Sequence, residues 1–390
     1  MRRVCIVVQN YYDIDPRVRR TAECLIEAGD FVDVLCLRMR GKREKHYSLN
    51  KVQVYTIPLP KRRAGKLQYF LEYFIFGAWA TLILSYRMLR YSYQIIHVNT
   101  LPDSLVFCAL IPKFMGAKVI LDMHEVMPEF FMSKYRVPET HPMIRLLKWQ
   151  EKLSIRFADH VIVINEPIKK LLEMRNLPPE KATVITNSVD EHLFIPIKGN
   201  SSDGNSFIFM YHGTLTHIYG LDIALEAFSK ASAQLPQAEF WIIGDGPERF
   251  NLENQAKRLG IKDRVNFVGV LPQEDIPAQL AKCDVGVLPT RRDQFLELSF
   301  SNKLPEYIIM EKPVIASRLK AIRHYFSEEA IAFFEPENAT DLAEKMIELY
   351  NSPEKRMGYA EHALREYADI RWERMKQLYL EVVHRLITSK

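Results

Sequence analysis

Cysteine is scarce in this chain. The 390 residues contain five cysteines, an odd number, and no two of them form a C-x-x-C pair. Each has apolar neighbours, which favours reduced core thiols of a cytosolic protein over disulfides or metal ligands. The five are Cys5, Cys24, Cys36, Cys108 and Cys283.

The chain also lacks a long apolar N-terminal segment. Met1-Arg2-Arg3 leads into a short apolar run that ends at Gln9. Such a run is typical of a buried strand and not of a signal peptide. We therefore expect a cytoplasmic protein that associates at most peripherally with the inner face of the cell membrane.

Two further features exclude functional classes. Neither half of the chain has a G-x-G-x-x-G motif after its first apolar run, which disfavours a dinucleotide enzyme. The net charge of +5 is too small to indicate a nucleic-acid partner. Hydrophobic and charged fractions of 48% and 26% are those of a soluble globular protein, and 390 residues exceed what one core usually serves. We expect two domains and no nucleic acid.

Short β-type runs alternate with helical patterns along the whole chain. The predicted strands are 4–8, 31–37, 52–57, 95–98, 118–121, 160–164 and 183–185 in the first half, and 207–211, 239–243, 265–267, 285–288, 314–316 and 331–334 in the second. This alternation predicts an α/β protein with two Rossmann-like, doubly wound domains that face a cleft.

The domain boundary is predicted from a loss of periodicity. After Asn187 the chain enters a polar stretch, residues 199–205, which we interpret as a linker or a loop beside it. We expect an N-terminal domain of residues 1–190 and a C-terminal domain of residues 205–368. Apolar residues three and four positions apart predict a closing helix from Tyr367 to Ile387.

The first turn of the N-terminal half contains Asp13-Ile14-Asp15, which formally matches a D-x-D metal motif. Asp15 directly precedes Pro16, and this pair is a common start of a helix. We favour helix capping over metal binding, and we predict no bound metal and no other cofactor.

The segment 301–317 is the most informative part of the chain. Pro305 lacks a backbone donor, which places it in the first turn of a helix that begins at about Ser301 or Asn302. Backbone N–H groups at that start, together with Lys303, suit a phosphate, and Glu306 can accept hydrogen bonds from the two hydroxyls of a ribose. The alternative is an ordinary surface helix with solvated charges.

Glycine-containing turns follow the predicted strands of the second half. They are Gly213-Thr214-Leu215, Gly220-Leu221-Asp222 and Gly244-Asp245-Gly246-Pro247. Glycines after strands are usually only turn residues. These turns, however, fall at the carboxyl ends of strands, which is the edge where open α/β sheets bind ligands.

In this order the motifs resemble the retaining GT-B-fold glycosyltransferases, the family 4-like or group 1 glycosyl transferases of bacterial cell-surface glycan synthesis. The resemblance covers nearly the whole chain. It rests on Asp15-Pro16-Arg17-Val18-Arg19-Arg20, Leu121-Asp122-Met123-His124-Glu125, Asn187-Ser188-Val189-Asp190, Tyr211-His212-Gly213-Thr214-Leu215, Gly244-Asp245-Gly246-Pro247, Phe267-Val268-Gly269 and Lys303 with Glu306. In that fold a terminal helix crosses back onto the first domain, so we assign residues 369–390 there.

The resemblance implies a nucleoside-diphosphate sugar as co-substrate. The donor-binding residues that it implies are Gly213, Thr214, Tyr219, Gly244, Gly246, Val270, Arg291, Asn302, Lys303, Leu304 and Glu306. Lys303 and Glu306 are also expected to be catalytic, with His124, which follows an apolar strand and occupies the place of a histidine near the donor sugar. A structural histidine is the alternative. On the acceptor side we expect Asp15, Arg17, Glu125 and Glu129.

The chain departs from the family pattern at the diphosphate. Thr214 and Tyr219 stand where many relatives carry an arginine and a lysine. The positive charge must then come from elsewhere, and the available candidates are Lys303, Arg291 and Arg292. The spacing of Glu297 from Glu306 differs by one residue from that of relatives with two glutamates here, so Glu297 is given no role.

The implied reaction moves a hexosyl or N-acetylhexosaminyl group to an acceptor hydroxyl with retained anomeric configuration. The departing diphosphate gains negative charge, which Lys303 and the helix start are placed to stabilise. The resemblance implies front-face attack, with the leaving phosphate helping to take the acceptor proton.

One segment of the N-terminal half suggests a membrane surface. A basic run, residues 61–66, precedes the aromatic and aliphatic run 67–86, and Arg87 and Arg90 follow. Glu72 within the run, and its place as a crossover helix, argue against a transmembrane span. Basic flanks around Trp79 and several tyrosines fit a face resting on an anionic bilayer, and a core helix or a loop of solvated charges are the alternatives. Contact through residues 61–91 would favour a lipid-linked or cell-surface glycan acceptor.

Two other functions remain open at this stage. A nucleotide-sugar 2-epimerase uses the same architecture but needs additional acid and base groups around the sugar. A catalytically silent, membrane-associated binding subunit would be compatible with the replacements at Thr214 and Tyr219.

Overall fold

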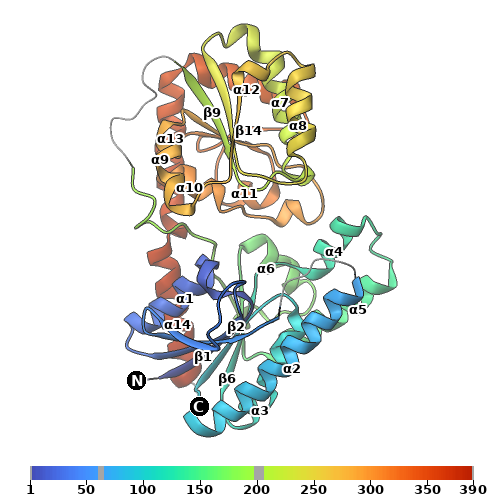
Figure 1. Ribbon diagram of the computed structural model, residues 1–390, viewed down its shortest axis with the longest axis vertical. Coiled ribbons are helices and arrows are strands. Elements are labelled where there is room, and N and C mark those ends of the chain that lie inside the picture. The colour runs from blue at the N-terminus through green and yellow to red at the C-terminus, as the bar shows by residue number, and fades with distance from the viewer. Residues whose placement is uncertain (1, 60–65, 197–205, 389–390) are drawn as a thin grey trace. The chain divides into compact units, whose positions relative to one another are not determined.

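The computed structural model describes residues 2–59, 66–196 and 206–388, and it divides into two compact units. Unit 1 comprises Met1–Thr186 and Glu373–Lys390, and unit 2 comprises Asn187–Trp372 (Figure 1). The predicted linker at 199–205 and most of the basic run at 61–66 lie outside the described residues.

Unit 1 is built on an eight-stranded sheet with the order β3-β4-β2-β1-β5-β6-β7-β8. The strands are β1 (Arg3–Tyr11), β2 (Phe31–Leu37), β3 (His46–Leu49), β4 (Val52–Ile57), β5 (Ile95–Asn99), β6 (Lys118–Met123), β7 (His160–Val163) and β8 (Ala182–Val184). All neighbours pair in parallel except β3, which pairs antiparallel with β4 and was not predicted. The chain reverses its direction of travel across the sheet between β1 and β5, which makes this a doubly wound, Rossmann-like sheet.

The helices of unit 1 cover both faces of its sheet. They are α1 (Pro16–Glu27), α2 (Lys66–Tyr91), α3 (Leu110–Phe114), α4 (Met127–Tyr135), α5 (Pro142–Phe157), α6 (Glu166–Glu173) and α14 (Trp372–Thr388). In Figure 1, α1 and α14 lie on one side of the sheet, and α2 and α3 lie on the other. A hydrogen bond of 2.9 Å between Tyr379 Oη and His97 Nδ1 joins α14 to β5 in the core.

Unit 2 is built on a six-stranded, all-parallel sheet with the order β11-β10-β9-β12-β13-β14. The strands are β9 (Phe207–His212), β10 (Ala238–Ile243), β11 (Val265–Gly269), β12 (Val285–Leu288), β13 (Val314–Ser317) and β14 (Ala332–Phe334). This is strand order 3-2-1-4-5-6, and β9 is the central strand at which the chain changes direction. The prediction of two Rossmann-like α/β domains with parallel sheets is confirmed.

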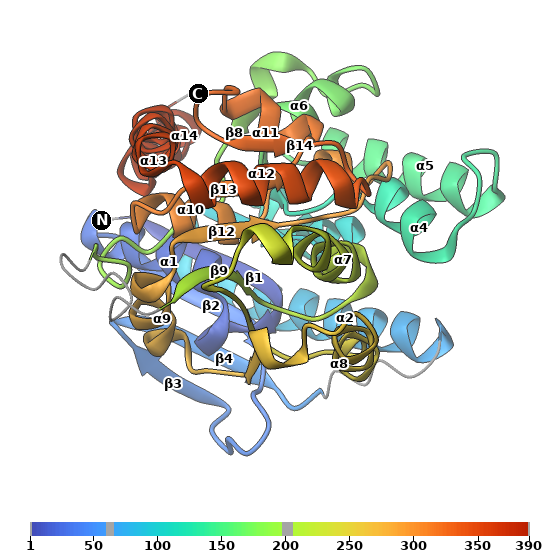
Figure 2. The same ribbon diagram turned by 90° about the horizontal axis from the view of Figure 1, so that it is seen from above.

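The helices of unit 2 are α7 (Leu221–Ala231), α8 (Arg249–Arg258), α9 (Ile276–Lys282), α10 (Lys303–Ile309), α11 (Lys320–Tyr325), α12 (Ala339–Asn351) and α13 (Pro353–Tyr367). Helices α7 and α12 pack side by side, as Figure 2 shows. The predicted closing helix begins too early, because Tyr367 is the last residue of α13 and a short turn, Ala368–Ile370, separates it from α14.

All five cysteines are buried and carry free thiols, as the sequence predicted. Within the described ranges, no helix is both long and apolar enough to cross a bilayer.

Candidate functional site

The predicted donor residues of unit 2 gather where its sheet changes direction. Strand β9 pairs with β10 on one side and with β12 on the other. In open parallel sheets this switch leaves a crevice beyond the carboxyl ends of the two diverging strands. The turn after β9 begins with Gly213, and the helix after β12 begins with Lys303. The two meet at this crevice.

The turn residues after β9 and β10 approach one another too closely for side chains. Gly213 and Gly244 have φ angles of 129° and 130°, which side-chain-bearing residues rarely adopt. A Cβ at Gly213 would overlap Cε of Lys303, and a Cβ at Gly244 would overlap the carbonyl of Gly213. A Cβ at Gly246 would overlap the carbonyl of Leu215. Glycine here gives Lys303 its space.

The ammonium of Lys303 is enclosed by aromatic rings. Its Nζ lies 4.2 Å from the ring centroid of Tyr219 and 5.6 Å from that of Tyr211. Burial lowers the pKa of Lys303 to about 8, against the opposing effect of Glu306. A lysine with this pKa retains its charge at neutral pH, and it has lost much of the hydration that would otherwise compete with an anion.

Glu306 is held by a residue that the sequence analysis did not single out. His212 Nε2 donates a 2.5 Å hydrogen bond to Glu306 Oε2. The side chain of His212 is only 6% exposed, and its Nδ1 has no hydrogen-bond partner among the described residues. One oxygen of Glu306 is therefore fixed while the other faces away from this bond. The signal was the position of His212, which ends β9 directly before Gly213.

Helix α10 is fixed to the sheet by Tyr307. The hydroxyl of Tyr307 donates to the carbonyl of Met210 on β9 at 2.7 Å, and its ring fills the space over Gly286 on β12. The helix has seven residues, and the amides of Lys303 and Leu304 already bond to Ser301. The charge for an anion is therefore supplied by the Lys303 side chain more than by the helix start.

The other predicted cations are engaged by carboxylates. Arg291 donates to Asp222 at 2.5 Å and to Glu337 at 2.9 Å, so its charge is balanced. Arg292 pairs with Glu297 at 2.7 Å. Glu297 also accepts the amide of Lys320, which accounts for it as a structural residue.

The remaining predicted donor residues are spread around the site. Val270 directly follows β11 and is 74% exposed, and Thr214 and Asn302 are also exposed. Leu304 is fully buried in the core, so only its backbone could face a ligand.

A second polar cluster lies at the carboxyl ends of β5 and β6 in unit 1. Asp122 accepts a 2.5 Å bond from Arg17 and lies 3.3 Å from His97 Nε2 and 3.4 Å from His124 Nε2. Burial opposes ionisation of Asp122, but Arg17 and the two histidines outweigh it and hold its pKa well below the usual range. His124 also bonds to Asn99 Oδ1 at 3.1 Å.

This network orients His124, whose side chain is 23% exposed, from behind. A buried anion beside an imidazole stabilises the protonated ring and fixes its orientation. Asp122 was quoted within a family motif but was not predicted as a site residue, although it precedes His124 by two positions on the same strand.

The four predicted acceptor-side residues have different surroundings. Asp15 caps α1 through the amide of Val18, as predicted, and also accepts from Asn10. Arg17 belongs to the Asp122 network. Burial raises the pKa of Glu125. Glu129 is buried, and Arg175 donates to both of its oxygens.

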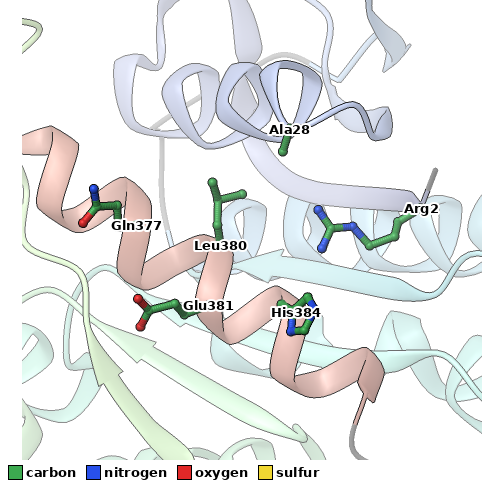
Figure 3. Close-up of a pocket in the computed structure, with 6 residues that line it drawn as sticks. All are labelled: Arg2, Ala28, Gln377, Leu380, Glu381 and His384. Atoms are coloured by element: carbon green, nitrogen blue, oxygen red, sulfur yellow. The ribbon is translucent and has the colours of Figure 1, made fainter.

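Unit 1 also has a shallow hollow beside α14. Its volume is about 460 Å³, and it is lined by Arg2, Ala28, Gln377, Leu380, Glu381 and His384 (Figure 3). It contains none of the predicted site residues. Arg2 is paired with Asp30 at 2.7 Å, which leaves little free charge there for a ligand.

The fold and the glycine, lysine and glutamate arrangement in unit 2 define a nucleotide-binding protein of two Rossmann-like domains. Residues 14–188 match the model of the "Glycosyl transferase 4-like domain", and residues 196–366 match that of "Glycosyl transferases group 1". The chain therefore belongs to the glycosyltransferase family of the GT-B type.

Solved structures have the same fold over the whole chain. Sucrose-phosphate synthase from Thermosynechococcus elongatus matches with a TM-score of 0.78 at 17% identity, covering 100% of both chains. HepE from Anabaena in complex with UDP matches with a TM-score of 0.74 at 17% identity, covering 98% of this chain and 100% of that one.

Curated relatives are more distant in length. The catalogue of Homo sapiens proteins contains a phosphatidylinositol N-acetylglucosaminyltransferase component that is 23% identical over 85% of this chain and 65% of its own length. The α-D-kanosaminyltransferase of Streptomyces kanamyceticus is 24% identical over 56% of this chain and 58% of its own. The chain thus spans less than two thirds of either relative.

Proposed function

We propose that this chain transfers a sugar from a nucleoside diphosphate to a hydroxyl group, with retention of the anomeric configuration. One observation carries the proposal: Lys303 and Glu306 of α10 reach the glycine turn after β9, so a cation and a carboxylate flank one crevice. Lys303 suits a diphosphate, and the oxygen of Glu306 not bonded to His212 suits a ribose hydroxyl.

The comparisons support a nucleotide sugar as the donor. The HepE structures were determined with UDP and with UDP-glucose, which makes uridine diphosphate sugars the first donors to test. The family matches do not favour an epimerase or a silent binding protein over a transferase.

In the proposed reaction the bond from the sugar C1 to the diphosphate breaks, and a bond from C1 to the acceptor oxygen forms. The proton of the acceptor passes to the leaving phosphate. Lys303 stabilises the charge that develops on the diphosphate, and this stabilisation is larger in the transition state than in the bound donor. We assign to His124 the contact with the sugar, oriented by Asp122 and Asn99.

We further propose that the acceptor is lipid-linked or part of a cell-surface glycan. Support comes from the human relative, whose name specifies phosphatidylinositol. The transferred group is then a hexose or an N-acetylhexosamine. No metal or other cofactor is assigned to the reaction.

The test is a panel of nucleotide sugars screened by thermal shift. A donor that binds only the folded protein raises its melting temperature by mass action. We expect one uridine diphosphate sugar to do so, and we expect Lys303→Ala and Glu306→Ala to lose the shift. The anomeric configuration of the product, read by NMR, then tests retention.

Matched controls separate the site from general surface charge. Lys257→Ala on α8 and Glu344→Ala on α12 remove exposed charges of the same unit and should leave the donor shift unchanged. An equal shift in the wild type, Lys303→Ala and Glu306→Ala would refute the site.

A further inference from the structure

Helix α2 presents apolar side chains to solvent along its whole described length. Phe74, Leu82 and Leu89 are 74%, 72% and 73% exposed. Leu71, Ile75 and Tyr86 are exposed as well. Surface helices of globular proteins usually place polar residues on the outer face.

These exposed residues form one face. Positions 71, 74, 75, 78, 82, 86 and 89 follow one another at intervals of mostly three or four residues, so they share one side of the helix. The opposite side packs into unit 1 through Phe76, Ala80, Leu84 and Met88, all buried. Helix α2 is thus apolar on both sides, although only one side faces the core.

Helix α3 packs against α2 and adds to the exposed apolar surface. Phe114 is 83% exposed, and Leu110 and Ile111 are exposed beside it. We call the exposed residues of α2 and α3 together the apolar face. Apolar surface on this scale in a soluble domain marks an interaction site.

The charges around the apolar face indicate what covers it. The basic run at 61–66 precedes α2, Arg90 follows the last exposed leucine, and Glu72 is the only acidic residue between positions 61 and 102. An apolar stripe with basic flanks and interfacial aromatics such as Tyr86 matches a membrane surface with anionic lipids.

We infer that the apolar face docks unit 1 on an anionic lipid bilayer, with α2 lying in the interface plane. Apolar side chains would enter the headgroup and acyl boundary while the basic flanks meet lipid phosphates. A second copy of the chain fits less well, because a two-fold pairing through α2 would bring its basic ends against each other.

The inference is tested by flotation of the full chain with lipid vesicles. We expect binding to phosphatidylcholine vesicles that contain phosphatidylglycerol, weaker binding to phosphatidylcholine alone, and a decrease with added salt. The double variant Phe74→Glu/Leu82→Glu should bind about tenfold less or worse, because each introduced charge must enter the interface.

Phe250→Glu on α8 of unit 2 is the matched control, because Phe250 is 73% exposed and lies outside the apolar face. It should bind vesicles as the wild type does. The milder Leu82→Ser, with its melting temperature and donor-induced thermal shift, shows that loss of binding does not arise from misfolding. Because this shift reports unit 2 alone, failure of docking and failure of the proposed donor site are distinguishable.

Three results would overturn the docking. They are absence of binding to anionic vesicles by the wild type, equal binding by the double variant, and a dimer in light scattering that Phe74→Glu/Leu82→Glu disperses.

Discussion

The ammonium of Lys303 lies 4.2 Å from the centroid of the Tyr219 ring. Tyr219 occupies a position where many glycosyltransferases of this type carry a second cation for the diphosphate. Here the ring holds the remaining cation in place through a cation–π contact, worth about 0.5–2 kcal/mol. The replacement therefore changes how the charge is delivered without removing it.

The Tyr219 contact leads to a graded prediction. Tyr219→Phe keeps the ring and should leave donor affinity within about threefold, whereas Tyr219→Ala should weaken it about tenfold, because Lys303 then gains freedom that binding must remove. Isothermal titration with the donor found in the screen measures both. Equal affinities for the two variants would contradict the contact's role.

Donor binding should depend on pH through Lys303. Burial lowers its pKa to about 8, so in the free protein the ammonium is present below that pH and is lost above it. Because binding a diphosphate requires the charged form, we expect affinity to be constant below pH 7 and to fall by up to about tenfold per unit above pH 8. Lys303→Arg stays charged throughout, and whatever affinity it retains should not vary over this range.

A hydrogen bond to a carboxylate fixes the ribose-binding residue. His212→Phe removes the donor to Glu306 while keeping an aromatic ring beside Tyr307. We expect donor KM to rise about five- to tenfold with a smaller change in kcat, because Glu306 becomes mobile but stays present. His212→Asn, which can still donate, should recover part of the affinity, and a purely structural histidine would instead lower the melting temperature of both variants alike.

A single methyl group at Gly213 should displace Lys303. Gly213→Ala places Cβ where Lys303 Cε lies and imposes a φ of 129° on alanine. We expect loss of the donor-induced thermal shift and a destabilisation of about 1–3 kcal/mol. Gly358→Ala in α13 is the control: its Cβ meets nothing within 4 Å, and it should stabilise by about 0.5–1 kcal/mol in urea unfolding.

Asp103 should make unit 1 less stable as pH rises. Its carboxyl is fully buried, has no hydrogen-bond partner among the described residues, and burial raises its pKa to about 7. Between pH 4, where the unfolded carboxyl ionises, and pH 7, stability falls because only the folded state keeps the proton. Asp103→Asn should raise the free energy of unfolding by about 1–3 kcal/mol at pH 8 and by less at pH 5, and an equal gain at both values would contradict this.

Much of the fold is readable from the sequence because buried parallel strands are continuous apolar runs. Strands β2, β4 and β12 have the predicted bounds. The strand that was missed, β3, is an exposed edge strand with only four residues and polar side chains among them, so it has no apolar run to recognise. Likewise, the break after Tyr367 separates two segments that are both helical in pattern.

The site was predicted unevenly for a related reason. Lys303 and Glu306 stand in a recognisable local pattern, but their partners come from distant segments. His212 lies 94 residues from Glu306, and Arg17 lies 105 residues from Asp122. Sequence alone also could not show that Arg291 is neutralised by Asp222, because that pairing depends on how α7 packs beside the loop after β12.

The hydrogen bond between His97 and Tyr379 spans 282 residues. Unit 2 is continuous in sequence, but unit 1 is completed by a segment that begins only at Glu373. During synthesis on the ribosome the second unit is therefore whole before the first receives its last helix. The order in which the two cores can close is the reverse of the order in which their first strands emerge.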